Sequence, residues 1–225
     1  MHVCLFDIDG TLIHTAGAGI AALRTTMQTV YGCDASRTEV VTTGRTDRAI
    51  VEELFEIHGV ESSDENWQVY LAAYLEHLPV SLAACPGRVL AGIPELLALL
   101  AQREDVVLGL LTGNSHPAAQ HKLGHYGLNE YFTFGGFGGD HIDRDDVARL
   151  ALAEVHARFN GSIAPDRIHV IGDTPLDVRC ARAIGARAIA VATGTHDLVA
   201  LRESNPDLLV EDFVDASPLL ELLVT

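Results

Sequence analysis

Lysine is almost absent from this chain of 225 residues: it has a single lysine, Lys122, and 14 arginines. These 15 basic residues face 31 acidic ones, which gives a formal net charge of −16 with histidine neutral. Such an acidic protein lacks the basic face that nucleic acids and anionic membranes require. We therefore expect neither partner, and we expect any phosphate site to be made positive locally by a metal ion, backbone N–H groups or arginine.

Cysteine is also scarce, and long hydrophobic runs are missing. The four cysteines are widely spaced and form no Cys-x-x-Cys pair, which argues against zinc ribbons and disulfide-stapled scaffolds. The most apolar stretch, 89–101, is interrupted by Pro94 and Glu95 and is too short to span a bilayer. Polar residues follow too soon after Met1 for a signal peptide. The sequence predicts a soluble cytoplasmic protein with reduced thiols.

Short apolar runs alternate with helical stretches along most of the chain. Most runs are apolar at consecutive positions, as in strands that are covered on both faces. This alternation predicts an α/β fold with a doubly wound parallel sheet and helices on both faces. The expected strands are Val3–Ile8, Val106–Leu111, Tyr131–Phe134, Ile168–Ile171, Ala186–Ala192 and Leu208–Val210. The expected helices are Ile93–Gln102, Ala118–Tyr126, Asp146–Phe159 and Leu176–Ile184.

One interval interrupts this alternation. Residues 16–84 contain no convincing strand, and instead contain amphipathic helical stretches at Ile20–Val30, Asp47–His58 and Asp64–Leu78. This interval is too long for a simple crossover and suits a small helical domain. We therefore expect a helical domain at 16–84 inserted into a core domain made of 1–15 and 85–225.

A glycine-rich stretch at 135–139 invites comparison with nucleotide-binding loops. It lacks the Gly-Lys-Ser/Thr ending of a P-loop. The pattern therefore predicts a flexible connection between a strand and a helix.

The first expected strand ends in two carboxylates, Asp7 and Asp9, followed by Gly10. Residues two apart in a strand point to the same side, and the carboxyl end of a parallel strand is where open sheets bind ligands. Two like charges are unfavourable there unless a cation or a proton compensates them. A pair of turn aspartates that merely caps a loop is the alternative for an isolated Asp-x-Asp.

Polar side chains follow two further strands. Thr112, Gly113 and Asn114 end the second, where a hydroxyl and free backbone N–H groups could approach an oxyanion. Asp173 and Asp177 follow the strand at 168–171 and could face a hard divalent cation together with Asp7. Mg²⁺ prefers oxygen ligands of this kind. Capping of the following helix also explains Asp177, and explains Asp173 less well.

Such a site also needs a cation near the nucleophile, and two residues are candidates. Lys122 lies ten residues after Thr112 inside an expected helix, and Arg144 precedes the helix that starts near Asp146. Arginine stays charged and offers a planar fork to phosphate oxygens. The residues alone leave both candidates open.

With these motifs the sequence resembles the haloacid dehalogenase-like hydrolases, and most closely their phosphoglycolate phosphatase branch with a helical cap. Asp7-Ile8-Asp9-Gly10-Thr11 matches the first motif of the family, and Thr112 matches the second. Gly172-Asp173 with Asp177 matches the fourth motif. The third motif usually contains lysine, and here Arg144 stands at the matching spacing, 32 residues after Thr112. On this match we assign the cationic role to Arg144 and keep Lys122 as the second candidate, interpreted first as a solvated helix residue. The resemblance covers nearly the whole chain and implies a Rossmann-like core with an inserted cap.

The resemblance also implies an Mg²⁺-dependent phosphatase mechanism. Asp7 would attack phosphorus to form an aspartyl-phosphate, and Asp9 would protonate the leaving alcohol and then activate water. The phosphoryl oxygens would be held by Thr112, Gly113, Asn114 and Arg144. The metal ligands would be Asp7, Asp9 (through its backbone carbonyl), Asp173 and Asp177, with Asp177 either ligating through a water molecule or holding Arg144. The presence of Asp9 favours phosphoryl chemistry, because the dehalogenases of the family lack this second aspartate.

The insertion is expected to determine which phosphomonoester binds. Within the stretch 42–48, Arg45 could hold a carboxylate or a second phosphate of the substrate. A plain helix start, with Asp47 as its cap and Arg45 in solvent, is an equal alternative. Small residues at 15–19 suit a hinge, and His14 either touches substrate or is a loop histidine.

Three alternatives remain beside the phosphatase interpretation. Zinc binding by His116, His121 and His125 is disfavoured, because no acidic or cysteine ligand lies at a fitting spacing. A sugar-phosphate mutase would share the cap and both aspartates. A catalytically silent binding module would keep only the fold. The expected partner is a small phosphomonoester, and the expected state is a monomer or a homodimer.

Overall fold

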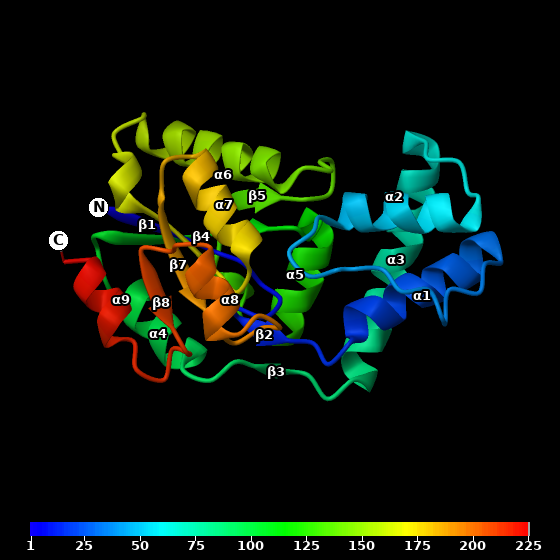
Figure 1. Cartoon of the computed structure of the whole chain (residues 1–225), viewed down its shortest axis with the longest axis horizontal. Helices are drawn as coiled ribbons and strands as arrows, with labels where there is room; N and C mark the ends of the chain where they lie inside the picture. Colours follow the sequence, from blue (N-terminus) through cyan, green and yellow to red (C-terminus); the bar gives the residue numbers. More distant parts are fainter. Residues whose placement is uncertain (225) are drawn as a thin grey trace.

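The centre of the molecule is a parallel sheet of six strands (Figure 1). The computed structural model describes residues 1–224. The strand order is β5-β4-β1-β6-β7-β8, and each neighbouring pair is parallel. The strands are β1 (His2–Phe6), β4 (Val106–Thr112), β5 (Gly135–Phe137), β6 (Ile168–Gly172), β7 (Arg187–Val191) and β8 (Leu208–Val210). The predicted doubly wound parallel sheet is confirmed.

Helices cover both faces of this sheet. On one face, Cys4 and Phe6 of β1 pack in a cluster with α4 (Ile93–Ala101), α5 (His116–His125) and α9 (Ser217–Leu222). On the other, Val3 and Leu5 pack with α6 (Arg144–Phe159), α7 (Pro175–Ala183) and α8 (Leu198–Glu203). Because β1 is buried on both sides, its sequence shows no alternation of apolar and polar residues. No helix within residues 1–224 is both long and apolar enough to cross a membrane.

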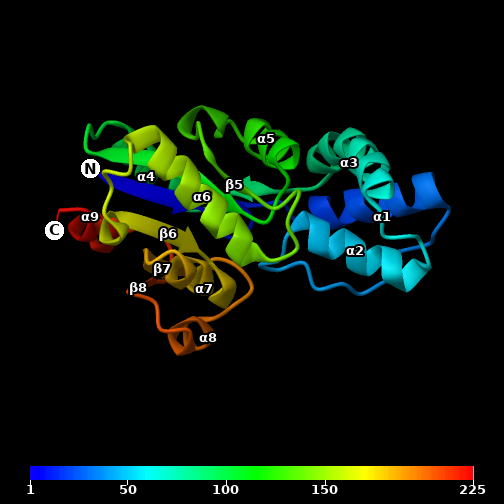
Figure 2. The ribbon, with the colours of Figure 1, turned by 90° about the horizontal axis from the view of Figure 1, so that it is seen from above.

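Three helices of the insertion lie side by side beyond the carboxyl ends of the strands (Figure 2). They are α1 (Ala18–Tyr31), α2 (Asp47–His58) and α3 (Asp64–Ala84), and they enclose a hydrophobic cluster of their own. Trp67, Tyr70 and Tyr74 lie inside this cluster. The chain enters the insertion through β2 (Ile13–His14) and returns through β3 (Arg88–Val89), which pair antiparallel. The division into a cap domain of 16–84 and a core domain stays a prediction.

The edge strand β5 corrects the sequence analysis. The strand predicted at Tyr131–Phe134 is wrong, because a 3₁₀ turn occupies Asn129–Tyr131 and the strand forms within the glycine run. Glycine has low strand propensity, yet here it is required by close contacts. A Cβ on Gly135 would lie 2.5 Å from the carbonyl oxygen of Leu110, and one on Gly136 would lie 2.3 Å from that of Val147.

Two histidines form a buried pair near the amino ends of β1 and β6, away from the insertion. His2 Nδ1 lies 2.9 Å from His169 Nε2, and Arg167 Nη1 lies 2.7 Å from His2 Nε2. Because the guanidinium can only donate, His2 Nε2 accepts and His2 Nδ1 donates to His169. The pair is therefore neutral, with the remaining proton of His169 on Nδ1.

This pair predicts a loss of stability in mild acid. Burial, with smaller contributions from His2 and Arg187, lowers the pKa of His169 to about 4. The unfolded chain then binds a proton on this ring near pH 6.5, whereas the folded chain resists it until about pH 4. We expect this ring to remove about 3 kcal/mol from the free energy of unfolding as the pH falls through that window. The measurement is the free energy of unfolding in urea for the wild type and for His169→Asn as a function of pH. If the two proteins lost the same free energy as the pH falls, the prediction would be contradicted.

Candidate active site

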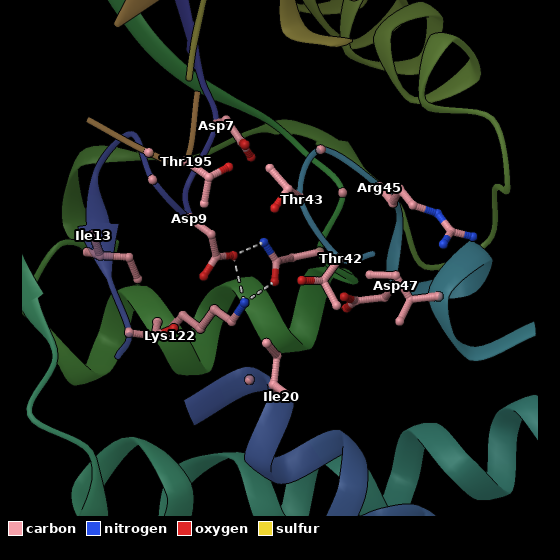
Figure 3. Close-up of a pocket in the computed structure, with 18 of the residues that line it drawn as sticks. Asp7, Asp9, Ile13, Ile20, Thr42, Thr43, Arg45, Asp47, Lys122 and Thr195 are labelled. Carbon is pink, nitrogen blue, oxygen red and sulfur yellow. Dashed lines mark hydrogen bonds and ion pairs between the residues drawn. The ribbon is translucent and has the colours of Figure 1, made fainter. Parts of the chain in front are cut away.

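A cavity of about 280 Å³ lies between the carboxyl edge of the sheet and the insertion (Figure 3). The core side is lined in large part by residues that follow the neighbouring strands β4, β1, β6 and β7. The insertion side is lined by Ile20, Leu23, Thr42, Thr43, Ile50 and Tyr74. The order of the strands thus gathers the ends of distant chain segments at one place, as expected for an open parallel sheet.

Asp7 faces a buried arginine. Its side chain is 7% exposed, and Arg144 Nη2 lies 3.0 Å from Asp7 Oδ2. The same Nη2 donates to Asp177 Oδ1 at 2.6 Å, while Asp177 Oδ2 accepts from the backbone N and the hydroxyl of Thr174. Asp177 is thereby held by the start of α7 and in turn holds Arg144 against Asp7. The assignment of the cationic position to Arg144 therefore agrees with its placement.

Three carboxylates converge beside this arginine. Ligand oxygens of Asp7, Asp173 and Asp177 all lie within 4.8 Å of one another, and the three residues are buried. Burial, together with the neighbouring carboxylates, raises the pKa of Asp7 to about 6 and that of Asp173 to about 8. Arg144 alone does not compensate this negative charge. A buried set of oxygen donors short of positive charge fits a hard divalent cation such as Mg²⁺.

Two glycines shape the position of Asp173. Thr11 Oγ1 donates to Asp173 Oδ1 at 3.2 Å. A Cβ on Gly10 would lie 2.5 Å from Asp173 Oδ2, and one on Gly194 would lie 1.7 Å from the same atom. Only residues without a side chain therefore allow this carboxylate to reach the acidic cluster.

Filling this space should weaken metal binding. The Gly194→Ala substitution forces the Asp173 carboxylate away from Asp7 and Asp177, so we expect the Mg²⁺ affinity to fall about 10- to 100-fold. The measurement is the thermal stabilisation of the protein as Mg²⁺ is added. Gly124→Ala on α5, whose nearest neighbour is the side chain of Asn129, is the matched control. Equal Mg²⁺ stabilisation of both variants would contradict this role of Gly194.

Asp9 belongs to a separate network. Its Oδ2 accepts from Lys122 Nζ at 2.6 Å and from Asn114 Nδ2 at 2.8 Å. Asn114 Nδ2 also lies 2.8 Å from Thr112 Oγ1. The interpretation of Lys122 as a solvated residue is wrong, because it is only 5% exposed. Burial alone would lower the pKa of Lys122, but Asp9 and Asp47 outweigh it and raise this pKa.

The start of α2 docks on the core loops of the site. The backbone N–H of Asp47 donates to the carbonyl of Gly113 at 2.7 Å, and Asp47 Oδ2 accepts from the N–H of Ser115 at 2.7 Å. Burial raises the pKa of Asp47. The hydroxyl of Thr46, and not Asp47, caps the helix. The insertion therefore closes directly over the loop that follows β4.

Arg45 lies beside the site without pointing into it. Its backbone lines the cavity, but its guanidinium pairs with Glu53 and donates to the carbonyls of Val41 and Ala49. Figure 3 shows the side chain directed away from Asp7. The structure therefore does not bring Arg45 together with the other predicted phosphate-binding residues, and it also excludes the alternative of an unpaired arginine in solvent.

Comparison with known proteins agrees with this arrangement. A family model described as haloacid dehalogenase-like hydrolase matches residues 4–191, most of the chain. The chain belongs to this family.

Relatives of this haloacid dehalogenase-like hydrolase extend over its whole length. A phosphoglycolate phosphatase of Agrobacterium fabrum is 26% identical over 227 residues, covering 99% of this chain and 94% of the relative. One of Synechococcus elongatus is 28% identical over 215 residues, covering 94% and 93%. The fold is shared with CbbY of Rhodobacter sphaeroides, solved in complex with phosphate, with a TM-score of 0.73, 21% identity and 96% coverage of both chains.

The sequence analysis of this hydrolase placed most site residues near one another but missed two. Lys122 and Asp47 both face the cavity, and neither was assigned a role there. A signal for Lys122 was present, because it follows Ala118 by four residues and Ala119 by three, on the apolar side of α5. Asp47 offered no comparable signal, since an acidic residue is ordinary in a first helical turn.

Proposed function

We propose that this hydrolase is a phosphatase that cleaves a small phosphomonoester through phosphorylation of Asp7. The observation that supports it best is the position of Asp7: a buried carboxylate held by Arg144, within a cluster of acids, and two residues before Asp9 at the mouth of the same cavity. A nucleophile, a cation for the phosphoryl oxygens and an acid–base group are then within one site.

We propose Mg²⁺ as the cofactor. Asp7 and Asp173 would hold it through carboxylate oxygens, the backbone carbonyl of Asp9 would be a further ligand, and Asp177 would complete the acidic set while it holds Arg144. When bound, the ion would neutralise charge on the phosphoryl oxygens and on the clustered carboxylates. The donor chemistry and the unbalanced negative charge of this cluster support the assignment.

In the first half-reaction, an oxygen of Asp7 attacks phosphorus. The bond from phosphorus to the ester oxygen breaks, its electron pair stays on that oxygen, and the proton of Asp9 passes to it to give the alcohol. Thr112, the backbone N–H of Gly113 and Arg144 hold the remaining phosphoryl oxygens. The side-chain amide of Asn114 donates to both Asp9 and Thr112, and so holds the acid–base group next to the residue that would bind the phosphoryl oxygens.

In the second half-reaction, Asp9 acts as a base. A water oxygen attacks phosphorus while its proton passes to Asp9, the bond between phosphorus and Asp7 breaks, and inorganic phosphate leaves. Asp9 then holds the proton for the next leaving group. The insertion acts as a cap in this scheme, because closure of its 42–48 segment on the loop after β4 shields the site from bulk water.

We propose a phosphoglycolate-like metabolite as the substrate. The names of the relatives and the modest size of the cavity support this class. Phosphate release from a panel of phosphomonoesters, including 2-phosphoglycolate and hexose phosphates, tests it with Mg²⁺ and with EDTA. We expect release that depends on Mg²⁺ and is fastest with 2-phosphoglycolate. Release from no ester would contradict the proposed activity, and preference for a hexose phosphate would contradict only the substrate.

A further inference from the structure

Lys122, the single lysine of the chain, makes a closed set of contacts with Asp9 and Asn114 (Figure 3). Its Nζ lies 2.6 Å from Asp9 Oδ2 and 2.6 Å from Asn114 Oδ1. Asn114 Nδ2 completes the triangle by donating to the same Asp9 Oδ2 at 2.8 Å. Both bonds to Asp9 use one oxygen, which leaves Oδ1 as the oxygen available to a substrate or a water molecule.

Asp9 needs such contacts because little else restrains it. Its side chain is 40% exposed, whereas that of Lys122 is 7% exposed. A carboxylate at the mouth of a cavity rotates freely unless it is bonded, and a displacement of about 1 Å at a reacting group can cost about 100-fold in rate. The orientation of Asp9 therefore depends on the groups that hold Oδ2.

Both of these groups belong to the part of the chain outside the insertion. Asn114 follows β4, and Lys122 projects from α5, whose Ala119 and Leu123 pack in the hydrophobic cluster against the sheet. The insertion approaches this region at Gly19, where an added Cβ would lie 3.7 Å from Lys122 Nζ. Asp9 is thus held by two side chains that come from outside the insertion.

We propose that Lys122 is a positioning residue that holds Asp9 in place as the base for hydrolysis of phosphorylated Asp7. This inference rests on the proposed function. After the first alcohol has left, Asp9 Oδ1 is then the oxygen that accepts the proton of the attacking water. Were Asp9 free to turn away, no base would accept the proton of the attacking water, and phosphorylated Asp7 would persist.

The test separates the two half-reactions with p-nitrophenyl phosphate in the presence of Mg²⁺. This ester has a good leaving group and needs little help from an acid, so its kcat/KM reports phosphorylation of Asp7, and slow hydrolysis appears as a burst of nitrophenol. We expect Lys122→Met to lower kcat about 10- to 100-fold, with kcat/KM changed less than about threefold. The intact mass should show phosphorylated protein at steady state.

Controls separate positioning from a general structural effect. Lys122→Arg should restore part of kcat, because it again donates to Asp9, and His121→Met, on the exposed side of the same helix, should behave as the wild type. Lys122→Gln replaces the methionine variant if the latter does not fold. The inference is overturned if kcat and kcat/KM fall equally, or if no phosphorylated protein accumulates. Failure of the wild type itself to be phosphorylated would instead overturn the proposed function.

Discussion

Replacement of Asp7 by asparagine is expected to abolish phosphate release, with a loss of about 10⁴-fold or more in kcat. The amide fills the same space beside Arg144 but has no anionic oxygen to attack phosphorus. The measurement is Mg²⁺-dependent release from p-nitrophenyl phosphate, combined with the intact mass of the protein after incubation. No phosphorylated protein should form. The same substitution removes one charge from the buried acidic cluster, so the variant should be at least as stable as the wild type without Mg²⁺.

Asp146→Asn provides the matched control for this prediction. Asp146 is an exposed aspartate of α6 that pairs with Arg149 at the surface. It should retain wild-type activity. If Asp7→Asn kept more than about a tenth of the activity, another group would be the nucleophile, and the mechanism built on Asp7 would be wrong.

The Arg144→Met variant should be strongly destabilised when no divalent cation is present. Arg144 is 4% exposed and is bonded to Asp7 and Asp177, so its removal leaves buried carboxylates without their cation. Removing one partner of a buried ion pair costs about 3–5 kcal/mol. We expect a loss of this size in urea unfolding, and we expect added Mg²⁺ to restore part of it by supplying the missing charge. Activity should fall in parallel, with Arg144→Lys intermediate.

Arg179 offers a comparison with the same chemistry at the surface. It bonds Asp143 and Asp145 but is 51% exposed. Surface ion pairs contribute about 0–1 kcal/mol, so Arg179→Met should change the free energy of unfolding by no more than that. Similar losses in the two variants would show that burial of Arg144 does not determine its effect.

Sequence pattern was enough to predict the sheet and the acidic site because both depend on local rules. Strands buried on both faces appear as continuous apolar runs, and parallel strands bring their carboxyl ends to one edge. Asp7, Thr112 and Asp173 could thus be placed together from the positions of three strand ends. The match to a family motif then suggested a chemistry that spacing alone would have left open.

The errors have a common physical origin in contacts between distant segments. The strand at 135–137 exists because glycine lets two backbones approach, which no propensity encodes. Lys122 can be buried because it forms an ion pair with Asp9, which follows β1. Arg45 does not point into the cavity because its guanidinium pairs with Glu53 of α2. The partner of a long charged side chain depends on which segments the fold brings near it, and the sequence contains many residues of opposite charge that could fill that role.

The short antiparallel ribbon of β2 and β3 has a mechanical consequence. The polypeptide leaves and re-enters the sheet layer through neighbouring residues, with Ile13 opposite Val89 and His14 opposite Arg88. The polypeptide therefore joins the three insertion helices to the sheet layer at one place, and only non-covalent contacts such as those of Asp47 hold them against the core elsewhere. Once those contacts break, bending at this ribbon would move the helices without stretching any strand of the sheet. Such an attachment also lets one set of helices be exchanged for another while the chemistry beneath it is preserved.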